Sequence, residues 1–284
     1  ESDLVSYPGM FLYNGDSDKC LEGKYAPYPK VEELGGHNML QMIVKDREDY
    51  LASCDGAART FPWRSISIST CDAQMADNDM VYRLARPCPA EEDYSWVKPG
   101  KVAWEWWNNW NVRGVDFVAG INTETYKYYI DFASRHGLEY VILDEGWAVK
   151  YADDLFKVVP EIDLEEIVRH GNEKNVGIIL WAGYSAFMKD IEGVCSHYAK
   201  MGVKGFKVDF LDRNDQKMED FIYKASEVAA RHKLVMDFHG CHQPTGLQRR
   251  FPNVLNYEGV FGLEQMRKRQ LPEYDMVEFD VTIP

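Results

Sequence analysis

The stretch VKGFKVDFLD, from Val203 to Asp212, is a short apolar run that ends on carboxylates. Three other stretches share this pattern: KVAWEWW (101–107), EYVILDEGW (139–147) and VLNYEGVFGLE (254–264). Each is typical of a buried strand, and an unpaired charge at the edge of a core is costly unless it has a function. In barrels of parallel strands that edge is the active-site face, so the pattern predicts a barrel with an acidic site.

The segments between these stretches carry helix signals. Tyr126, Tyr129, Ile130 and Ala133 form a helical stripe between a cap at 122 or 123 and Gly137, and Asp163 with Glu166 has the spacing of a capping box. We expect six strands, near Val102, Val141, Ile178, Val208, Val235 and Leu255. They fit the first six units of a (β/α)8 TIM barrel better than a doubly wound sheet. A doubly wound nucleotide-binding sheet should have a glycine-rich turn after its first strand, and the segment WWNNWN at that place is not one. The sequence ends at VTIP, where a seventh strand is expected, so about two units are predicted to be absent.

The organisation of the chain changes near Pro99 and Gly100. Before this point, alternating runs such as MLQMIV and RSISIST lie between turn-rich segments, which favours strands of an antiparallel sheet. After it, strand and helix patterns alternate. The predicted domains are therefore residues 1–98 and residues 99–284, the second being the barrel.

Composition excludes several classes of function. The 284 residues are 45% hydrophobic and can bury one large core. A net charge of −14 argues against nucleic acid, which is bound by clustered Lys and Arg, and suits calcium or a neutral sugar. The sequence has no run of roughly 18 apolar residues, so no membrane span is expected. Six cysteines without a CxxC pair disfavour zinc and leave disulfides open.

Asp209 and Glu264 form the most informative candidate pair. Glycoside cleavage needs one ionised carboxylate at the anomeric carbon and one protonated carboxyl group for the leaving oxygen. Lys207 lies two residues before Asp209, so both face one side of a strand, where the ammonium would keep Asp209 ionised. Phe261 and Leu263 give Glu264 an apolar setting, which would raise its pKa towards that of a general acid.

Simpler interpretations compete with this one. A KxD pair in a strand is often a structural ion pair, and Glu264 alone resembles a solvated loop carboxylate. Asp144 and Glu145 fit a helix cap as well as a sugar contact. The tryptophans between 104 and 110 are usual core residues, although their rings also suit sugar faces, and His239 resembles an ordinary hydrogen-bonding histidine.

An ordered set of motifs resembles glycoside hydrolase family 97. The motifs are YPGMFL, YAPYP, FPWR, SWVKPGKVAWEWWN, YVILDEGW, GVKGFKVDFLDRNDQ, HGCHQPTGLQRRFPN, NYEGVFGLEQM and DVTIP, and they cover nearly the whole chain. The resemblance implies an N-terminal β-sandwich, a catalytic (β/α)8 barrel and a C-terminal β domain. Residues 1–98 would then be the C-terminal part of the sandwich with a linker, and residues 99–284 an incomplete barrel.

The family has a retaining and an inverting branch, and the motifs resemble the retaining one. Its nucleophile maps onto Asp209 in KVDF, and its acid/base maps onto Glu264. Inverting members carry a base glutamate where this chain has Gly240. The retaining branch implies an exo-acting α-galactosidase whose two carboxyl groups lie roughly 5 to 5.5 Å apart. Sugar-binding candidates by motif position are Lys207, Asp144, Glu145, Trp104 and His239.

The resemblance also implies calcium, held beside the sugar by glutamates. The candidates are Glu258, Glu264 and, from the sandwich side, Glu1. A periplasmic or secreted location follows from the same resemblance. The alternatives are an α-glucosidase of the same family, a non-catalytic carbohydrate-binding barrel, and a metal-dependent lyase or isomerase.

Overall fold

The central feature of the fold is a six-stranded parallel sheet. The structure is a computed structural model, and it describes residues 10–14, 21–49, 65–71, 73–74, 77–149, 154–242, 246–259 and 264. The strands are β5 (Val102–Trp104), β6 (Tyr140–Leu143), β7 (Gly177–Gly183), β8 (Gly205–Asp209), β9 (Val235–His239) and β10 (Val254–Glu258). Neighbouring strands are parallel and lie in sequence order, β10-β9-β8-β7-β6-β5.

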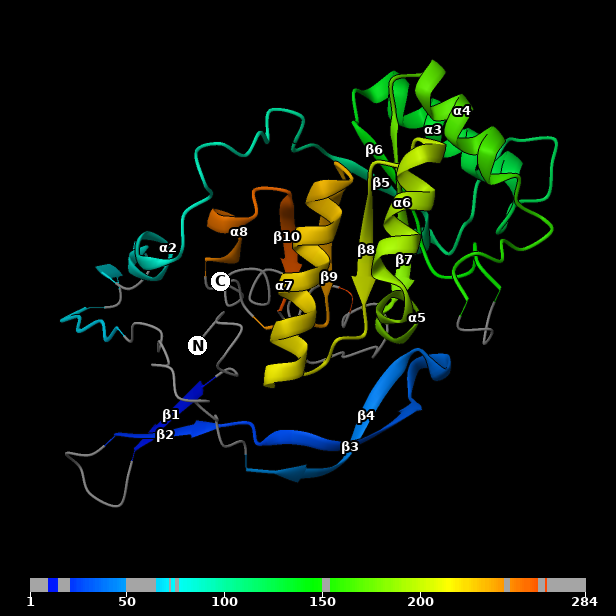
Figure 1. Cartoon of the computed structure of the whole chain (residues 1–284). Coiled ribbons are helices and arrows are strands. Elements are labelled where there is room, and N and C mark those ends of the chain that lie inside the picture. The colour runs from blue at the N-terminus through cyan, green and yellow to red at the C-terminus, as the bar shows by residue number, and fades with distance from the viewer. Residues whose placement is uncertain are drawn as a thin grey trace.

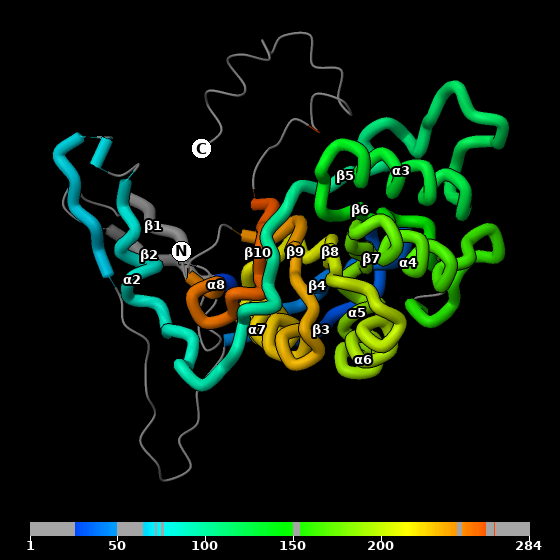
Figure 2. The backbone as a smooth tube through the Cα atoms, turned by 90° about the horizontal axis from the view of Figure 1, so that it is seen from above, coloured from blue at the N-terminus to red at the C-terminus, as the bar shows by residue number. Residues whose placement is uncertain are grey.

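This strand order confirms the predicted partial TIM barrel. A doubly wound sheet reverses its order at a switch point, whereas a barrel adds each strand beside the one before it. Seen from above, the row of strands from β10 to β5 curls (Figure 2). In the side view, α6 and α7 lie along one side of the sheet (Figure 1). All six strands fall at the predicted positions.

Helices cover the outer face of the sheet. They are α3 (Thr123–His136), α4 (Leu164–Glu173), α5 (Tyr184–Lys189), α6 (Ile191–Met201), α7 (Gln216–Arg231) and α8 (Leu247–Arg250). Asn122 caps α3 by accepting a hydrogen bond from the amide of Thr125 at 2.9 Å, and α3 ends at Gly137, whose φ is 64°. Asp163 caps α4 in the same way, through the amide of Glu166. Both predicted helix starts are therefore confirmed.

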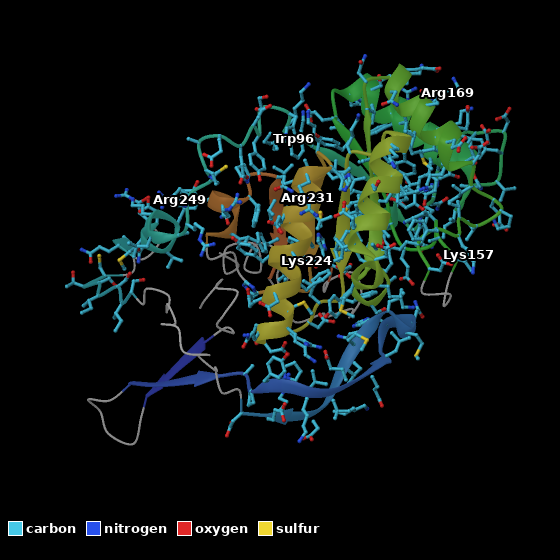
Figure 3. All side chains as sticks on the ribbon, in the orientation of Figure 1. Trp96, Lys157, Arg169, Lys224, Arg231 and Arg249 are labelled. Atoms are coloured by element: carbon cyan, nitrogen blue, oxygen red, sulfur yellow. The ribbon has the colours of Figure 1, made fainter. Side chains whose placement is uncertain are left out.

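The core lies between these helices and the sheet. In β8, the side chains on one face lie in this core and those on the other face line the site. Phe206 and Val208 are fully buried among the core residues. Lys207 and Asp209 point to the other side of the strand, because successive side chains alternate. Burial of each large apolar side chain contributes roughly 1.5–3 kcal/mol, so the outer face anchors the strand that presents the charged residues. Figure 3 shows the outer surface of α7, from which Lys224 and Arg231 project.

The part before the barrel contains antiparallel pairs. These are β1 (Met10–Asn14) with β2 (Leu21–Tyr25), and β3 (Tyr28–Gly35) with β4 (Gln41–Glu48), the latter joined through the short helix η1 (His37–Met39). Most of the predicted strand MLQMIV lies in β4. Two further short helices, α2 (Met80–Leu84) and η2 (Glu105–Asn108), were not predicted. The predicted sandwich itself stays a prediction.

One strand prediction was wrong. In the run RSISIST, the described residues 65–70 form no strand, and Ile66 and Ile68 are exposed by 73% and 92%. An alternating pattern forms a strand only where its apolar face packs and its backbone pairs. Among the described residues this run has neither.

Candidate active site

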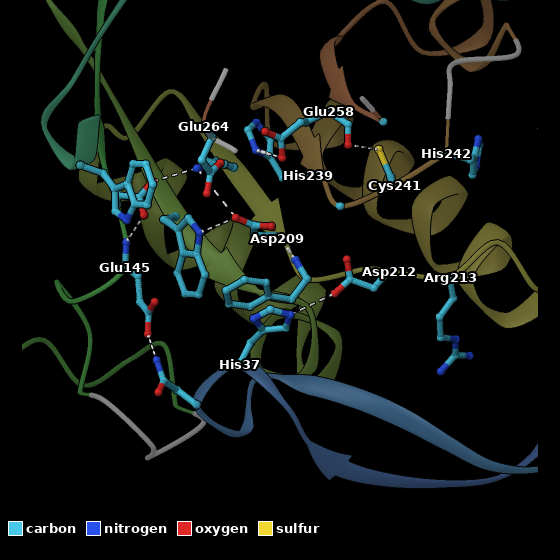
Figure 4. A pocket seen from close by; sticks show the side chains of 18 of the residues that line it. His37, Glu145, Asp209, Asp212, Arg213, His239, Cys241, His242, Glu258 and Glu264 are labelled. Atoms are coloured by element: carbon cyan, nitrogen blue, oxygen red, sulfur yellow. Dashed lines mark hydrogen bonds and ion pairs between the residues drawn. The ribbon is translucent and has the colours of Figure 1, made fainter. Parts of the chain in front are cut away.

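A cavity of about 890 Å³ lies at the carboxyl ends of the barrel strands (Figure 4). Its walls include every predicted site residue that the structure describes. They are Trp104, Asp144, Glu145, Lys207, Asp209, His239, Glu258 and Glu264. Glu1 lies outside the described residues. The sequence prediction that strands distant in the chain present their acidic ends to one place agrees with this arrangement.

Asp209 is the last residue of β8, and hydrogen bonds fix both of its carboxyl oxygens. Oδ2 accepts from Trp181 Nε1 at 3.1 Å, and Oδ1 accepts from the amide of Phe210 at 2.7 Å. Lys207 Nζ lies 3.8 Å from Oδ2. The carboxylate is thus held in one orientation, with a positive charge beside it, at the edge of the cavity.

Lys207 binds more closely to Asp144 than to Asp209. Its Nζ donates to Asp144 Oδ2 at 2.8 Å, and it lies 4.4 Å from the ring centroid of Trp104. Trp104 Nε1 donates to the same Asp144 oxygen at 2.6 Å. Although burial alone would lower the pKa of Lys207, the charges of Asp144 and Asp209 raise it above its usual value, so the lysine is a cation. Lys207 therefore joins the ends of β6 and β8.

His239 is engaged on both ring nitrogens. Nδ1 lies 3.0 Å from Glu258 Oε2, and Nε2 lies 3.1 Å from the carboxylate of Asp237. Burial would lower its pKa, but the hydrogen bonds to Asp237 and Glu258 raise the pKa to about 10. The hydrogen bond from His239 in turn holds the pKa of Glu258 below its ordinary value. The imidazolium neutralises charge at the ends of β9 and β10.

Glu264 lines the same cavity as Asp209, and Figure 4 shows the two side chains on the same part of its wall. It follows β10, so the two carboxyl groups come from the fourth strand of the sheet and from the segment after the sixth. Phe261 and Leu263, which the sequence placed around it, lie outside the described residues.

The tip of the β3–β4 hairpin also reaches the cavity, which the sequence did not predict. Asn38 Nδ2 donates to Glu145 Oε1 at 2.6 Å, and the His37 ring stacks on Phe210 with centroids 4.1 Å apart. His37 also approaches Asp212 at 3.5 Å (Figure 4). Nothing in the local sequence GGHN pairs it with a loop about 170 residues later.

Gly240 occupies a place where a side chain would not fit. Its φ is 60°, and a Cβ atom there would lie 2.6 Å from Asp212 Oδ1. Any L residue at this position would be strained in this backbone conformation, and the Asp212 carboxylate would have to move aside.

The fold and this acid-rich cavity define a barrel protein with its site at the carboxyl ends of the strands. A sequence profile described as Glycoside hydrolase 97 matches residues 104–260, and one described as Glycosyl-hydrolase 97 N-terminal matches residues 1–87. The chain belongs to glycoside hydrolase family 97.

Two curated relatives carry related names. The chain is 57% identical over 284 residues to a retaining alpha-galactosidase of Bacteroides thetaiotaomicron, covering 100% of this chain and 42% of the relative. It is 30% identical over 270 residues to a probable retaining alpha-galactosidase of Streptomyces bingchenggensis, covering 92% of this chain and 40% of the relative. The chain thus spans about two fifths of the length of these relatives.

Solved structures show the same fold. A glycoside hydrolase family 97 enzyme of Pseudoalteromonas sp. strain K8, solved with panose, superposes with a TM-score of 0.71 at 23% identity, covering 92% of this chain and 41% of that one. A beta-arabinopyranosidase superposes with a TM-score of 0.53 at 26% identity, over 66% of this chain and 29% of that one. Among the described residues, no helix is both long and apolar enough to cross a membrane.

Proposed function

We propose that this chain carries the active site of a retaining exo-α-galactosidase. The observation that supports this most directly is that Asp209 and Glu264, from separate parts of the barrel, line one cavity at the carboxyl ends of the strands. The family and the names of the two relatives support the reaction and the sugar. The substrate is a carbohydrate with a terminal α-galactosyl residue.

The proposed reaction has two steps. Asp209 attacks the anomeric carbon while Glu264 gives its proton to the glycosidic oxygen, so the C–O bond breaks and a glycosyl-enzyme forms. Glu264, now ionised, then takes a proton from water, whose oxygen displaces Asp209 with net retention. The hydrogen bonds from Trp181 and Phe210 aim the Asp209 carboxylate before the reaction begins. Asp144, Glu145, Lys207, Trp104 and His239 surround the sugar as binding groups.

Two substitutions test the assignment in the intact protein. Asp209→Asn and Glu264→Gln should each lower the turnover of nitrophenyl α-galactoside by at least about 100-fold, since each removes one group that the chemistry needs. Glu227→Gln, an exposed carboxyl on α7, is the matched control and should keep full turnover. Galactose affinity should largely survive in both active-site variants. Unchanged turnover in both would defeat the catalytic roles.

The product and substrate specificity separate the remaining alternatives. Under the proposal, NMR detects α-galactose as the first product, and nitrophenyl α-glucoside is not hydrolysed. Preference for the glucoside would favour an α-glucosidase of the same family. Galactose binding without turnover of either substrate would favour a non-catalytic carbohydrate-binding barrel.

We further propose calcium as the cofactor, on the basis of donor chemistry. Glu258 and Glu264 both bring carboxylate oxygens to the cavity, which are ligands that calcium prefers. Within the described residues, however, no group of three or more His, Cys, Asp and Glu side chains is arranged to hold a metal ion. A complete shell thus needs oxygens beyond these two, with Glu1 as the candidate. When bound, the ion would supply positive charge beside the sugar.

We propose a periplasmic or secreted location, which rests on the family resemblance alone. Cell fractionation with an antibody to the intact protein checks this. Recovery in the cytoplasmic fraction would contradict it.

A further inference from the structure

Glu105 is a buried carboxyl group that the proposed reaction does not use. It is the first residue of η2, directly after β5, and its side chain is fully buried. Oε1 accepts three hydrogen bonds, from the amide of Asp144 at 2.7 Å, from Tyr126 Oη at 3.0 Å and from Trp110 Nε1 at 3.2 Å. Oε2 is equally buried, and no described residue donates to it.

The surroundings of Glu105 favour a neutral carboxylic acid. Burying an ionised carboxylate without a cation costs far more than burying a neutral group that lacks one hydrogen bond. The nearby ammonium of Lys207 is already paired with Asp144 and Asp209. Burial and the negative charge of Asp144 together raise the pKa of Glu105 to about 8. At neutral pH the group therefore keeps its proton.

We propose that Glu105 is a positioning residue that acts as a neutral acid and, through Asp144 and Lys207, holds Asp209 in its reactive place. The steps are short and continuous: Glu105 Oε1 fixes the Asp144 amide, Asp144 Oδ2 binds Lys207 Nζ at 2.8 Å, and Lys207 lies 3.8 Å from Asp209. The same Asp144 backbone leads into Glu145, which lines the cavity. This inference rests on the proposed function and adds a residue to its machinery.

Loss of the Glu105 proton would disturb this arrangement. A new negative charge beside Asp144 would compete for the ammonium of Lys207, which already serves two carboxylates. The titratable groups that face Glu105 are Asp144 after β6, and Tyr126 and Tyr129 on α3. Burial raises the pKa of both tyrosines above their usual value, so they stay neutral donors. The titration of Glu105 is thus the charge change to expect in mildly alkaline solution.

The main experiment compares variants of the intact protein over pH 5 to 10. Glu105→Ala, which removes the shared acceptor, should lower kcat by on the order of 10- to 100-fold with a smaller change in KM. Glu105→Gln keeps an acceptor oxygen and the shape, so it should restore most of that loss. In Glu105→Gln, the part of the alkaline fall of kcat that is centred near the pKa of Glu105 should be lost. Glu124→Gln, an exposed carboxyl on α3, should leave the profile unmoved.

Two results would overturn the proposal. One is an alkaline limb at the same pH in wild type and Glu105→Gln. The other is a Glu105→Gln variant that is no more active than Glu105→Ala although circular dichroism shows both folded. If Glu105→Ala fails to fold, the comparison of Glu105→Gln with wild type still decides the matter through the pH profile.

A second readout does not depend on turnover. Because the folded pKa of Glu105 lies above its ordinary 4.5, its contribution to stability is complete below about pH 4.5 and is lost as the pH rises through about 8. The melting temperature of wild type relative to Glu105→Gln should therefore fall over this range. A constant difference would show that Glu105 does not titrate there. Absence of any galactoside hydrolysis, with the expected melting data, would defeat the proposed function while leaving the neutral acid in place.

Discussion

Lys207 shows how a single residue connects the fold to the site. It is 3% exposed and pairs with two carboxylates, Asp144 after β6 and Asp209 at the end of β8. Replacing it by Met leaves Asp144 buried without its cation, and breaking a buried pair in this way costs about 3–5 kcal/mol. We expect Lys207→Met to lose about 3 kcal/mol of unfolding free energy, because Trp104 still donates to Asp144. Urea unfolding checks this, with the exposed Lys204→Met as control; a loss below about 1 kcal/mol would contradict the prediction.

For single residues, the sequence predicted which side chains lie in the site better than it predicted which residues they bind. The KxD spacing placed Lys207 and Asp209 on one side of a strand, and that is confirmed, because side-chain alternation is a local property. The closer bond from Lys207 to Asp144 depends on how β6, β7 and β8 align, which no local pattern specifies. The role of Glu105 was missed for the same reason, although the acidic pattern included it.

The β3–β4 hairpin is held on the barrel by a cluster of ion pairs. Glu32 on β3 pairs with Arg213, after β8, at 2.5 Å and with Lys217 on α7 at 2.6 Å. Arg213 and Arg47 also bind Asp215, the buried cap of α7. This cluster keeps the hairpin tip, with His37 and Asn38, at the cavity wall. Sequence patterns predicted much of β4 but not the docking, because ion pairs separated by 181 positions leave no periodic signal.

The docking of the hairpin should depend on pH. Burial alone would raise the pKa of Glu32, but its hydrogen bonds with Lys217 and Arg213 lower it below 4.5. Its contribution to stability is therefore present above about pH 4.5 and is lost as the pH falls through the lowered pKa. Glu32→Gln should cost about 1.5–3 kcal/mol at pH 7 and much less near pH 3, as measured by denaturant unfolding.

Glu33, the residue next to Glu32, supplies a matched control for the Glu32→Gln substitution. Glu33 pairs with Lys45 on the exposed side of the same hairpin, where both side chains are about half exposed. Glu33→Gln should cost no more than about 1 kcal/mol, because solvent screens such pairs. Equal effects of the two substitutions at pH 7 would show that the Glu32 cluster does not hold the hairpin.

In the molecule as a whole, the barrel could be predicted because strand and helix patterns alternate along the sequence after residue 100. Each buried strand and amphipathic helix carries a local period, and the six strands occur where those periods place them. The exception, residues 65–70, has the right alternation without a packing partner in the described structure. The convergence of Asp209 and Glu264 on one cavity followed from barrel geometry, since carboxyl ends of parallel strands share one edge. The hairpin tip was missed because it comes from outside that repeat.

Calcium is the prediction that depends on the whole molecule, because its proposed ligands are Glu258, Glu264 and the distant Glu1. Ligand binding to the folded state alone stabilises it by about 2.7 kcal/mol when the free ion is at 100 times its Kd. We therefore expect the chelator EGTA to lower both the melting temperature and galactosidase turnover of the intact protein, and added Ca²⁺ to restore both. Magnesium should not restore them, because it demands a smaller octahedral site. Glu258→Gln should weaken the calcium-dependent shift, while Glu227→Gln, exposed on α7, should keep it. If the purified protein contained no calcium and its melting temperature changed with neither EGTA nor Ca²⁺, the calcium proposal would be wrong. The Glu258 carboxylate would then keep its ion pair with His239.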